Sequence, residues 1–209
     1  MRFIDLSHPL LSGQPSFPGD PVLEVRAHST TSDEARCNLS HISMGSHQGT
    51  HLDAMFHFKD GGKTLDQMPL DWFYGAARVL RFAKGPREDI TIDDFLPHEQ
   101  HLVPGARIIY ETGWSREFPH AHYFQDFPSL SIEAAQFLAD KRLRLLGMDT
   151  PTPSRDYYEV HHILLGVEMV IVESLANLGH LPDEFTFVGF PLNFCGRDGS
   201  PIRAVGLVP

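Results

Sequence analysis

Short apolar runs separated by turn-forming residues dominate the pattern of this chain. Sixteen Pro and 17 Gly punctuate it, in stretches such as "GQPSFPGDP", "KDGGK" and "CGRDGSP". Apolar runs of this length, bounded by such clusters, are typical of β-strands. The runs that we predict as strands are Val22–Val25, Ala77–Phe82, Arg107–Tyr110, Leu143–Gly147, Met169–Val172, Phe185–Val188 and Ile202–Leu207.

Two longer segments carry a helical spacing of apolar residues. Ser131 is a candidate N-cap for a helix over residues 132–142, whose apolar side chains share one face. A second helix is predicted to begin after Ser154 and to end at Gly166. Many strands and few helices, without regular alternation, predict an α/β or α+β fold on a mixed sheet. Because no Gly/Ser-rich or charged linker interrupts the chain, residues 1–209 are predicted to form one domain.

Composition and charge narrow the class of partner. Hydrophobic residues make up 42% of the chain, and 17 Lys and Arg against 27 Asp and Glu give a net charge of −10. No basic run interrupts this balance, which argues against nucleic acid or an anionic membrane and favours a small-molecule ligand. The N-terminus lacks the apolar core of a secretory signal, and no apolar run approaches the ~18–20 residues of a membrane span. We therefore expect a cytoplasmic protein whose two cysteines are not paired.

The stretch "SHQGTHLDAMFHF", residues 46 to 58, contains the candidate chemistry. His47, His51, Asp53 and His57 are all odd-numbered, so an extended strand would direct their side chains to one face. Imidazole and carboxylate together suit Zn²⁺, Mn²⁺ or a similar divalent ion. Along a straight strand His47 would lie ~13 Å from His51, so a bend at Gly49 would be needed to bring His47 back. A polar, solvated strand face remains the alternative reading.

Further ligands for such an ion are expected from "VHHILLGVEMVIVESL". His161 shares a helix stripe with apolar residues and should face inward, whereas His162 should be more exposed. Glu173 ends an apolar strand, where an unpaired carboxylate would be costly and a bound metal would relieve that cost. A core histidine and a carboxylate at a helix start are the alternatives for these two residues.

Several blocks of the sequence resemble one known family. "HQGTHLDAMFH" is similar to the H-x-G-T-H-x-D-x-P-x-H signature of the cyclase/kynurenine formamidase family of metal-dependent hydrolases. "FIDLSHPLLSGQPSFPGDP", "ETGW", "FPSLSIEAAQFLA", "GMDTPTPS", "HHILLGVEMVIVESLANL" and "PLNFCGRDGSPIRAVGL" resemble further blocks of that family, in family order. The resemblance implies a swivelling β/β/α fold and a homodimer or higher homo-oligomer.

The resemblance also assigns roles to residues of this chain. It implies that His47, His51 and Asp53 hold one metal ion, and that Asp53, His161 and Glu173 complete or bridge to a second. One or two divalent ions per chain are therefore expected, with Zn²⁺ as the first choice and Mn²⁺ as the alternative. His57 occupies the position of the family's general acid/base.

Two departures from the family pattern bear on the substrate. The signature Pro is Met55 here, and the aromatic residue that stacks on substrate, often Trp, is Phe17. The first expectation is an arylformamidase-like enzyme of tryptophan catabolism that cleaves N-formylkynurenine to kynurenine and formate. An isatin-type lactam hydrolase, a lactone hydrolase or a polyketide-type cyclase are alternatives on this scaffold. A protein that binds a small acid through a metal, without turnover, is the alternative outside enzymes.

Overall fold

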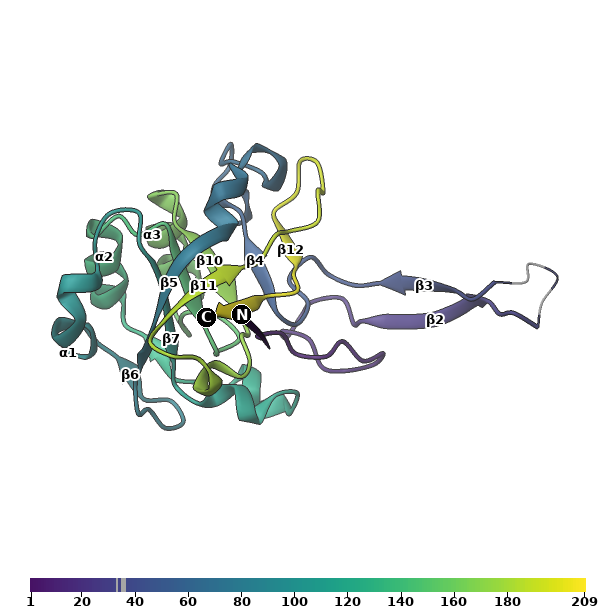
Figure 1. Ribbon diagram of the computed structural model, residues 1–209, viewed down its shortest axis with the longest axis horizontal. Helices are drawn as coiled ribbons and strands as arrows, with labels where there is room; N and C mark the ends of the chain where they lie inside the picture. The colour runs from purple at the N-terminus through teal and green to yellow at the C-terminus, as the bar shows by residue number, and fades with distance from the viewer. Residues whose placement is uncertain (33, 35–36) are drawn as a thin grey trace.

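A curled mixed sheet is the largest element of the computed structural model, which describes residues 1–32, 34 and 37–209 (Figure 1). Within these residues the sheet has nine strands in the order β1-β13-β11-β5-β7-β9-β10-β4-β12. Their bounds are β1 Arg2–Asp5, β4 His51–Asp53, β5 Tyr74–Arg81, β7 Arg107–Glu111, β9 Leu145–Met148, β10 Val170–Glu173, β11 Glu184–Val188, β12 Gly199–Pro201 and β13 Val205–Val208.

The centre of the sheet is parallel and both of its flanks are antiparallel. β5, β7, β9 and β10 pair in parallel, β4 and β12 continue antiparallel beyond β10, and β11, β13 and β1 do so beyond β5. In a parallel block the carboxyl ends of all strands meet at one edge, so the loops after β7, β9 and β10 are neighbours. The prediction of a mixed α/β fold is confirmed.

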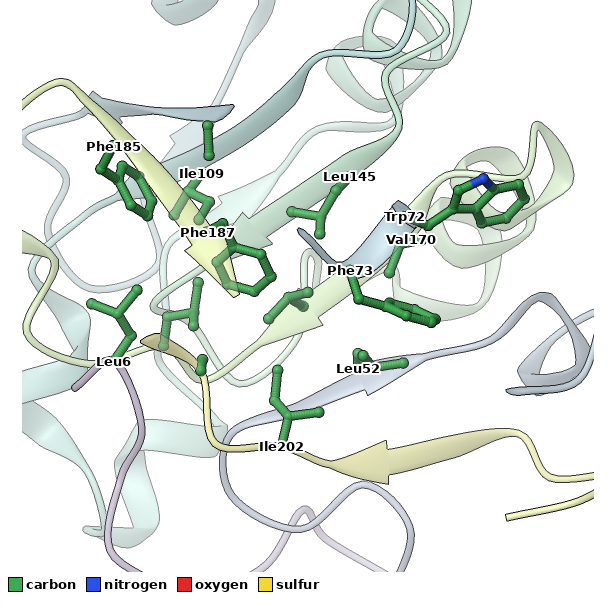
Figure 2. Close-up of a cluster of buried hydrophobic side chains, with 14 of the residues drawn as sticks. Leu6, Leu52, Trp72, Phe73, Ile109, Leu145, Val170, Phe185, Phe187 and Ile202 are labelled. Atoms are coloured by element: carbon green, nitrogen blue, oxygen red, sulfur yellow. The ribbon is translucent and has the colours of Figure 1, made fainter. Parts of the chain in front are cut away.

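Two hydrophobic cores cover the two faces of the sheet. On one face, strand residues such as Ile109, Leu145 and Val170 share a core with Trp72 and Phe73 of the 3₁₀ helix η3 (Leu70–Phe73), as Figure 2 shows. On the other face, alternate residues of the same strands pack against the helices. Leu145 thus belongs to one core and its neighbour Leu146 to the other. This alternation explains why the central strands read as continuous apolar runs.

Three α-helices in the described residues lie on that second face: α1 (Ile92–Phe95), α2 (Ile132–Asp140) and α3 (Tyr157–Gly166). The predicted N-cap of α2 is confirmed, because the Ser131 hydroxyl accepts the amide hydrogen of Ala134 at 3.1 Å. The predicted start of α3 directly after Ser154 is wrong: the helix begins at Tyr157, and Asp156 occupies its N-cap position without a side-chain capping hydrogen bond. Ser154 is buried instead, and its hydroxyl bonds the Leu130 carbonyl and contacts the Ser129 hydroxyl. None of the helices in the described ranges is long and apolar enough to cross a membrane.

A hairpin of β2 (Glu24–Ser29) and β3 (Leu39–Ser43) projects from the body of the protein (Figure 1). The strands pair antiparallel, with Val25 opposite Ile42. Both side chains are exposed, at 37% and 57%. A third, small sheet pairs β6 (Asp89–Ile90) with β8 (Ser129–Leu130) near α1.

Candidate metal centre and pocket

The short strand β4 presents two polar side chains on the helix side of the sheet. Leu52 points into the core shown in Figure 2, so its neighbours His51 and Asp53 point to the opposite face. His51 and Asp53 are 3% and 0% exposed. Strand periodicity thus places an imidazole and a carboxylate side by side within the protein.

Two other elements bring further ligand-type side chains to this point. Glu173, at the end of β10, lies directly opposite His51 in the antiparallel pairing, so both side chains occupy the same face. His161 reaches it from α3 and is buried, whereas His162 is exposed, as the helical stripe predicted. His51 Nε2 lies 3.1 Å from Glu173 Oε2, and His161 Nε2 lies 3.2 Å from Glu173 Oε1 and 3.4 Å from Asp53 Oδ2.

Backbone carbonyls fix the orientation of two of these imidazoles. His51 Nδ1–H donates to the Gly49 carbonyl at 2.7 Å, and His161 Nδ1–H donates to the Tyr157 carbonyl at 2.6 Å. The proton on Nδ1 leaves the Nε2 lone pair of each ring free to face the carboxylates. This is the arrangement by which proteins prepare histidine for a metal ion.

His47 and His57 reach the same place by two turns of the chain. Gly49 has φ +62°, which provides the bend expected between His47 and His51. His47 Nδ1 thereby lies 2.8 Å from Asp53 Oδ1. His57 ends the 3₁₀ helix η1 (Met55–His57), and its ring stacks on that of His47 with centroids 3.8 Å apart. Met55, which replaces the signature Pro, is 1% exposed and anchors this turn in the core.

The residues present fit a divalent metal ion. Two groups hold ligand atoms within 4.8 Å of one another, His47 with Asp53 and His57, and Asp53 with His161 and Glu173. Within the described part of the chain, the buried atoms His51 Nε2 and Asp53 Oδ2 have no hydrogen-bond partner. No Lys or Arg is among the described residues that line the pocket around these carboxylates. A cation would both satisfy the orphaned atoms and neutralise the buried charge.

Without a metal, protons on histidine balance the carboxylates. Burial alone would lower the pKa of His47, but the charges of Asp53 and Asp198 outweigh it and raise the pKa to about 10. The pKa of His161 is likewise raised to about 9 by Asp53 and Glu173, against the effect of burial. Burial lowers the pKa of His57 to about 4. For Asp53, burial would raise the pKa, but the neighbouring imidazoles hold it well below its usual value.

The cluster lies in a cavity of about 360 Å³ that is also lined by five aromatic side chains, Phe17, Phe58, Phe118, Phe124 and Tyr157. Such a volume suits a small molecule. Phe17, the predicted substrate contact, lines it and meets Tyr157 edge to face, with ring centroids 6.1 Å apart. Phe58, Phe118 and Phe124 line the same cavity and were not singled out from the sequence.

Buried Asp149 fixes the loop after β7 with its carboxylate and part of the aromatic wall with its main-chain carbonyl. Asp149, after β9, accepts hydrogen bonds from the Thr112 amide, the Thr112 hydroxyl and the Gly113 amide at 2.7 to 2.9 Å. Burial nevertheless raises its pKa to about 6. The Tyr123 hydroxyl donates to the Asp149 carbonyl at 3.1 Å, which ties the segment bearing Phe118 and Phe124 to the strand ends. The segments "TGW" and "GMDT" are therefore held together by hydrogen bonds at the ends of β7 and β9.

Asp198 and Ser46 also belong to this centre, and sequence reasoning missed both. Asp198 Oδ2 lies 2.8 Å from His47 Nε2 and accepts a hydrogen bond from the Ser46 hydroxyl at 2.9 Å. Asp198 lies in "GRDGSP", a stretch that reads as a simple turn. Asp198 lies in the loop between β11 and β12, and no local pattern in the sequence connects this loop to His47.

Comparisons with known proteins agree with this geometry. The profile of the Cyclase family, described as "Putative cyclase", matches residues 4–155. The kynurenine formamidase of Bacillus cereus is 30% identical over 215 residues, covering 98% of this chain and 96% of that protein. The structure of isatin hydrolase A from Labrenzia aggregata matches with a TM-score of 0.88 at 25% identity, covering 99% and 93%. A structure described as a potential metal-dependent hydrolase with cyclase activity matches with a TM-score of 0.81 at 27% identity, covering 98% and 96%.

Proposed function

Because the chain belongs to the cyclase family, we propose that it is an arylformamidase-like enzyme, with N-formylkynurenine as the first substrate to test. The coarser activity follows from its relatives: the protein is a metal-dependent hydrolase that acts on C–N bonds. The observation that carries the proposal is the His, Asp and Glu cluster within an aromatic-walled cavity. Because the relatives are hydrolases, the alternative of a binding protein without turnover is not favoured.

Five residues would hold the metal in this proposal. His47 and His51, whose ring nitrogens lie 2.8 and 3.5 Å from Asp53 Oδ1, would bind one ion together with Asp53, although the tightest group around His47 and Asp53 contains His57 in place of His51. Asp53, His161 and Glu173 would bind or bridge to a second ion, with Zn²⁺ preferred to Mn²⁺ for this donor set. When bound, such an ion would polarise a carbonyl group and lower the pKa of water towards ~7. The chain's own contribution is to hold the imidazoles in the required tautomer and to exclude bulk water.

His57 is proposed to move the proton during hydrolysis. Its ring is stacked on that of His47, and its side chain is 27% exposed, whereas those of His51 and His161 are 4% exposed. A nitrogen of this imidazole would take a proton during attack on the carbonyl and give it to the leaving nitrogen. Its ligand atoms also lie within reach of those of His47 and Asp53, but its greater exposure supports a proton-moving role over that of a permanent ligand.

Phe17 and the other aromatic residues would bind the ring of the substrate. Phe17, Tyr157 and Phe118 line the cavity, and an aromatic substrate ring could make the offset or edge contacts that aromatic pairs prefer. An aryl formamide or a fused aromatic lactam would therefore place its ring against this wall and its carbonyl at the cluster. The lactam reading stays as the second candidate because the fold also matches an isatin hydrolase.

A substrate panel tests the proposal. Protein loaded with Zn²⁺ or Mn²⁺ is expected to release formate from N-formylkynurenine in many turnovers per chain, with one to two ions bound per chain by elemental analysis. N-formylaniline lacks the amino-acid part of N-formylkynurenine and tests whether that part is needed. Opening of the isatin ring tests the alternative that the enzyme is a lactam hydrolase. Turnover of isatin alone would favour the second candidate. Stoichiometric binding without turnover across the panel would contradict both.

We further propose a cytoplasmic, single-domain protein that assembles into a homodimer or a higher homo-oligomer. The β2–β3 hairpin supports assembly, because an isolated two-stranded hairpin is only marginally stable and its Val25, Leu39 and Ile42 side chains are exposed. The two cysteines are free, which fits a reducing compartment.

Sedimentation tests this assembly. The expected mass is at least twice the 23.5 kDa of one chain. Ile42→Glu, on the hairpin, is expected to shift the protein towards the monomer, and Leu70→Glu is the matched exposed control. A wild-type protein that sediments as a monomer at micromolar concentration would contradict the assembly.

A further inference from the structure

Asp198 contacts the metal centre from outside the two ligand groups. It lies just before β12, in a part of the chain far in sequence from the histidine cluster. One of its oxygens, Oδ2, is 2.8 Å from His47 Nε2 and 2.9 Å from the Ser46 hydroxyl that donates to it. The same oxygen is 3.9 Å from His57 Nδ1, beyond hydrogen-bond distance. Its direct partner among the histidines is therefore His47.

His47 differs from the other two candidate histidine ligands in what holds its ring. The imidazoles of His51 and His161 donate Nδ1–H to backbone carbonyls, so their tautomers are set by the main chain. His47 turns its Nδ1 towards Asp53 at 2.8 Å, and its second nitrogen faces the Asp198 side chain. A metal-binding imidazole must carry its proton on the nitrogen remote from the ion. For His47 the group that can hold this proton is the Asp198 side chain, not a main-chain carbonyl.

The segment that carries Asp198 is fixed on both sides. The Asp198 carbonyl accepts the Ala54 amide at 2.8 Å, and the Gly196 amide donates to Asp66 Oδ1 at 2.8 Å. Gly199, which pairs with Asp53 in the sheet, packs against the His47 ring. A Cβ atom at position 199 would lie 2.5 Å from His47 Cε1, so only glycine leaves the ring in place. Main-chain hydrogen bonds on both sides of Asp198 therefore hold its carboxylate next to His47.

We propose that Asp198 is a positioning residue, whose carboxylate accepts Nε2–H from His47 and thereby leaves His47 Nδ1 free for the divalent cation. The inference rests on the proposed function, because it assigns a role towards the same metal. Asp198 touches neither substrate nor ion in this scheme. Ser46 supports it by donating to the same oxygen, which keeps that oxygen an acceptor facing His47.

Zn²⁺ affinity and the tautomer of His47 test this role. Metal-free wild type, Asp198→Ala and Asp198→Asn are titrated with Zn²⁺ against a chromogenic chelator. Because partners of this kind contribute 10–100-fold to metal affinity, Asp198→Ala is expected to bind Zn²⁺ about 10- to 100-fold more weakly. Asp198→Asn keeps an oxygen that can accept from Ser46 and His47, so its loss of Zn²⁺ affinity is expected to be smaller than that of Asp198→Ala. Long-range ¹H–¹⁵N spectra of the Zn²⁺-loaded protein should show the Nε2–H form of His47 in wild type and in Asp198→Asn.

Asp66→Ala is the matched control, because Asp66 anchors the same segment through Gly196 without touching His47. It is expected to retain wild-type Zn²⁺ affinity. An equal loss in Asp66→Ala would mean that Asp198 only shapes the loop and would overturn the inference. Unchanged affinity in Asp198→Ala would overturn it as well.

Two further outcomes are decisive. If Asp198→Ala does not fold, the tautomer in Asp198→Asn decides: retained Nε2–H supports the inference, and a mixture of tautomers overturns it. If wild type binds Zn²⁺ and hydrolyses the substrates, and Asp198→Ala has the same Zn²⁺ affinity as wild type, only this inference is overturned and the proposed function stands. Wild type that binds no Zn²⁺ overturns the proposed function and the inference together.

Discussion

Asp53→Ala is expected to lose bound metal and catalytic activity together. Asp53 is the residue that both ligand groups share, and it is fully buried between His47 and His161. Its removal takes a ligand from each proposed ion position at once. The loss of metal affinity should therefore exceed the ~10–100-fold that an outer partner contributes. Elemental analysis after removal of loose ions, and formate release in the same sample, measure both effects.

Asp20→Ala is the comparison for this variant. Asp20 lines the same cavity but belongs to neither ligand group. It should keep its metal, whatever it does to substrate affinity. Circular dichroism of metal-free Asp53→Ala checks that the fold persists. Full retention of metal in Asp53→Ala would contradict the shared-ligand assignment, and retained activity without metal would contradict the proposed function.

His57→Ala is expected to keep its metal and to lose most of its turnover. A correctly placed acid/base contributes ~10²–10⁴-fold, so kcat should fall by about that factor. The stack between His57 and His47 is lost, but His47 keeps its contacts with Asp53 and Asp198, so the ligand group stays in place. Single-turnover kinetics with N-formylkynurenine, beside metal content, measure the two effects.

His162→Ala controls for the loss of an imidazole near the pocket. His162 is exposed on α3, one residue from His161, and its Nδ1–H donates to the Tyr158 carbonyl. It should leave metal content and turnover unchanged. If His57→Ala loses metal to the same extent as it loses rate, His57 is a metal ligand and not the acid/base. Its position in a group with His47 and Asp53 permits that role as well.

Local pattern predicted the elements that carry the cluster better than those that surround it. The apolar run ending at Glu173 and the inward face of His161 follow from periodicity, and the structure has both. A bend at Gly49 was expected because glycine takes backbone angles that other residues avoid, and the structure has φ +62° there. The short edge strands β1 and β12 and the hairpin strand β3 were not predicted, because their pairing rather than their own sequence makes them strands.

The carboxylates that support the site, Asp198 and Asp149, were harder to predict, because they contact parts of the chain that are distant in sequence. Asp198 is 151 residues from His47, and Asp149 is 37 residues from Thr112. Neither carboxylate lies in a spacing that periodicity detects. Phe118 and Phe124 likewise line the cavity from a segment that the Tyr123–Asp149 hydrogen bond ties to the strand ends.

The two halves of the pocket have different origins, and this has an evolutionary consequence. The chemical groups come mainly from β4, β10 and α3, inside the layered body, whereas Phe17 and Phe118 come from surface segments outside the sheet. Substitutions in those segments can reshape the wall without moving His51, Asp53 or Glu173. One hydrolytic centre can therefore be adapted to new substrates by changing a few half-buried side chains outside the sheet, which makes this scaffold readily evolvable.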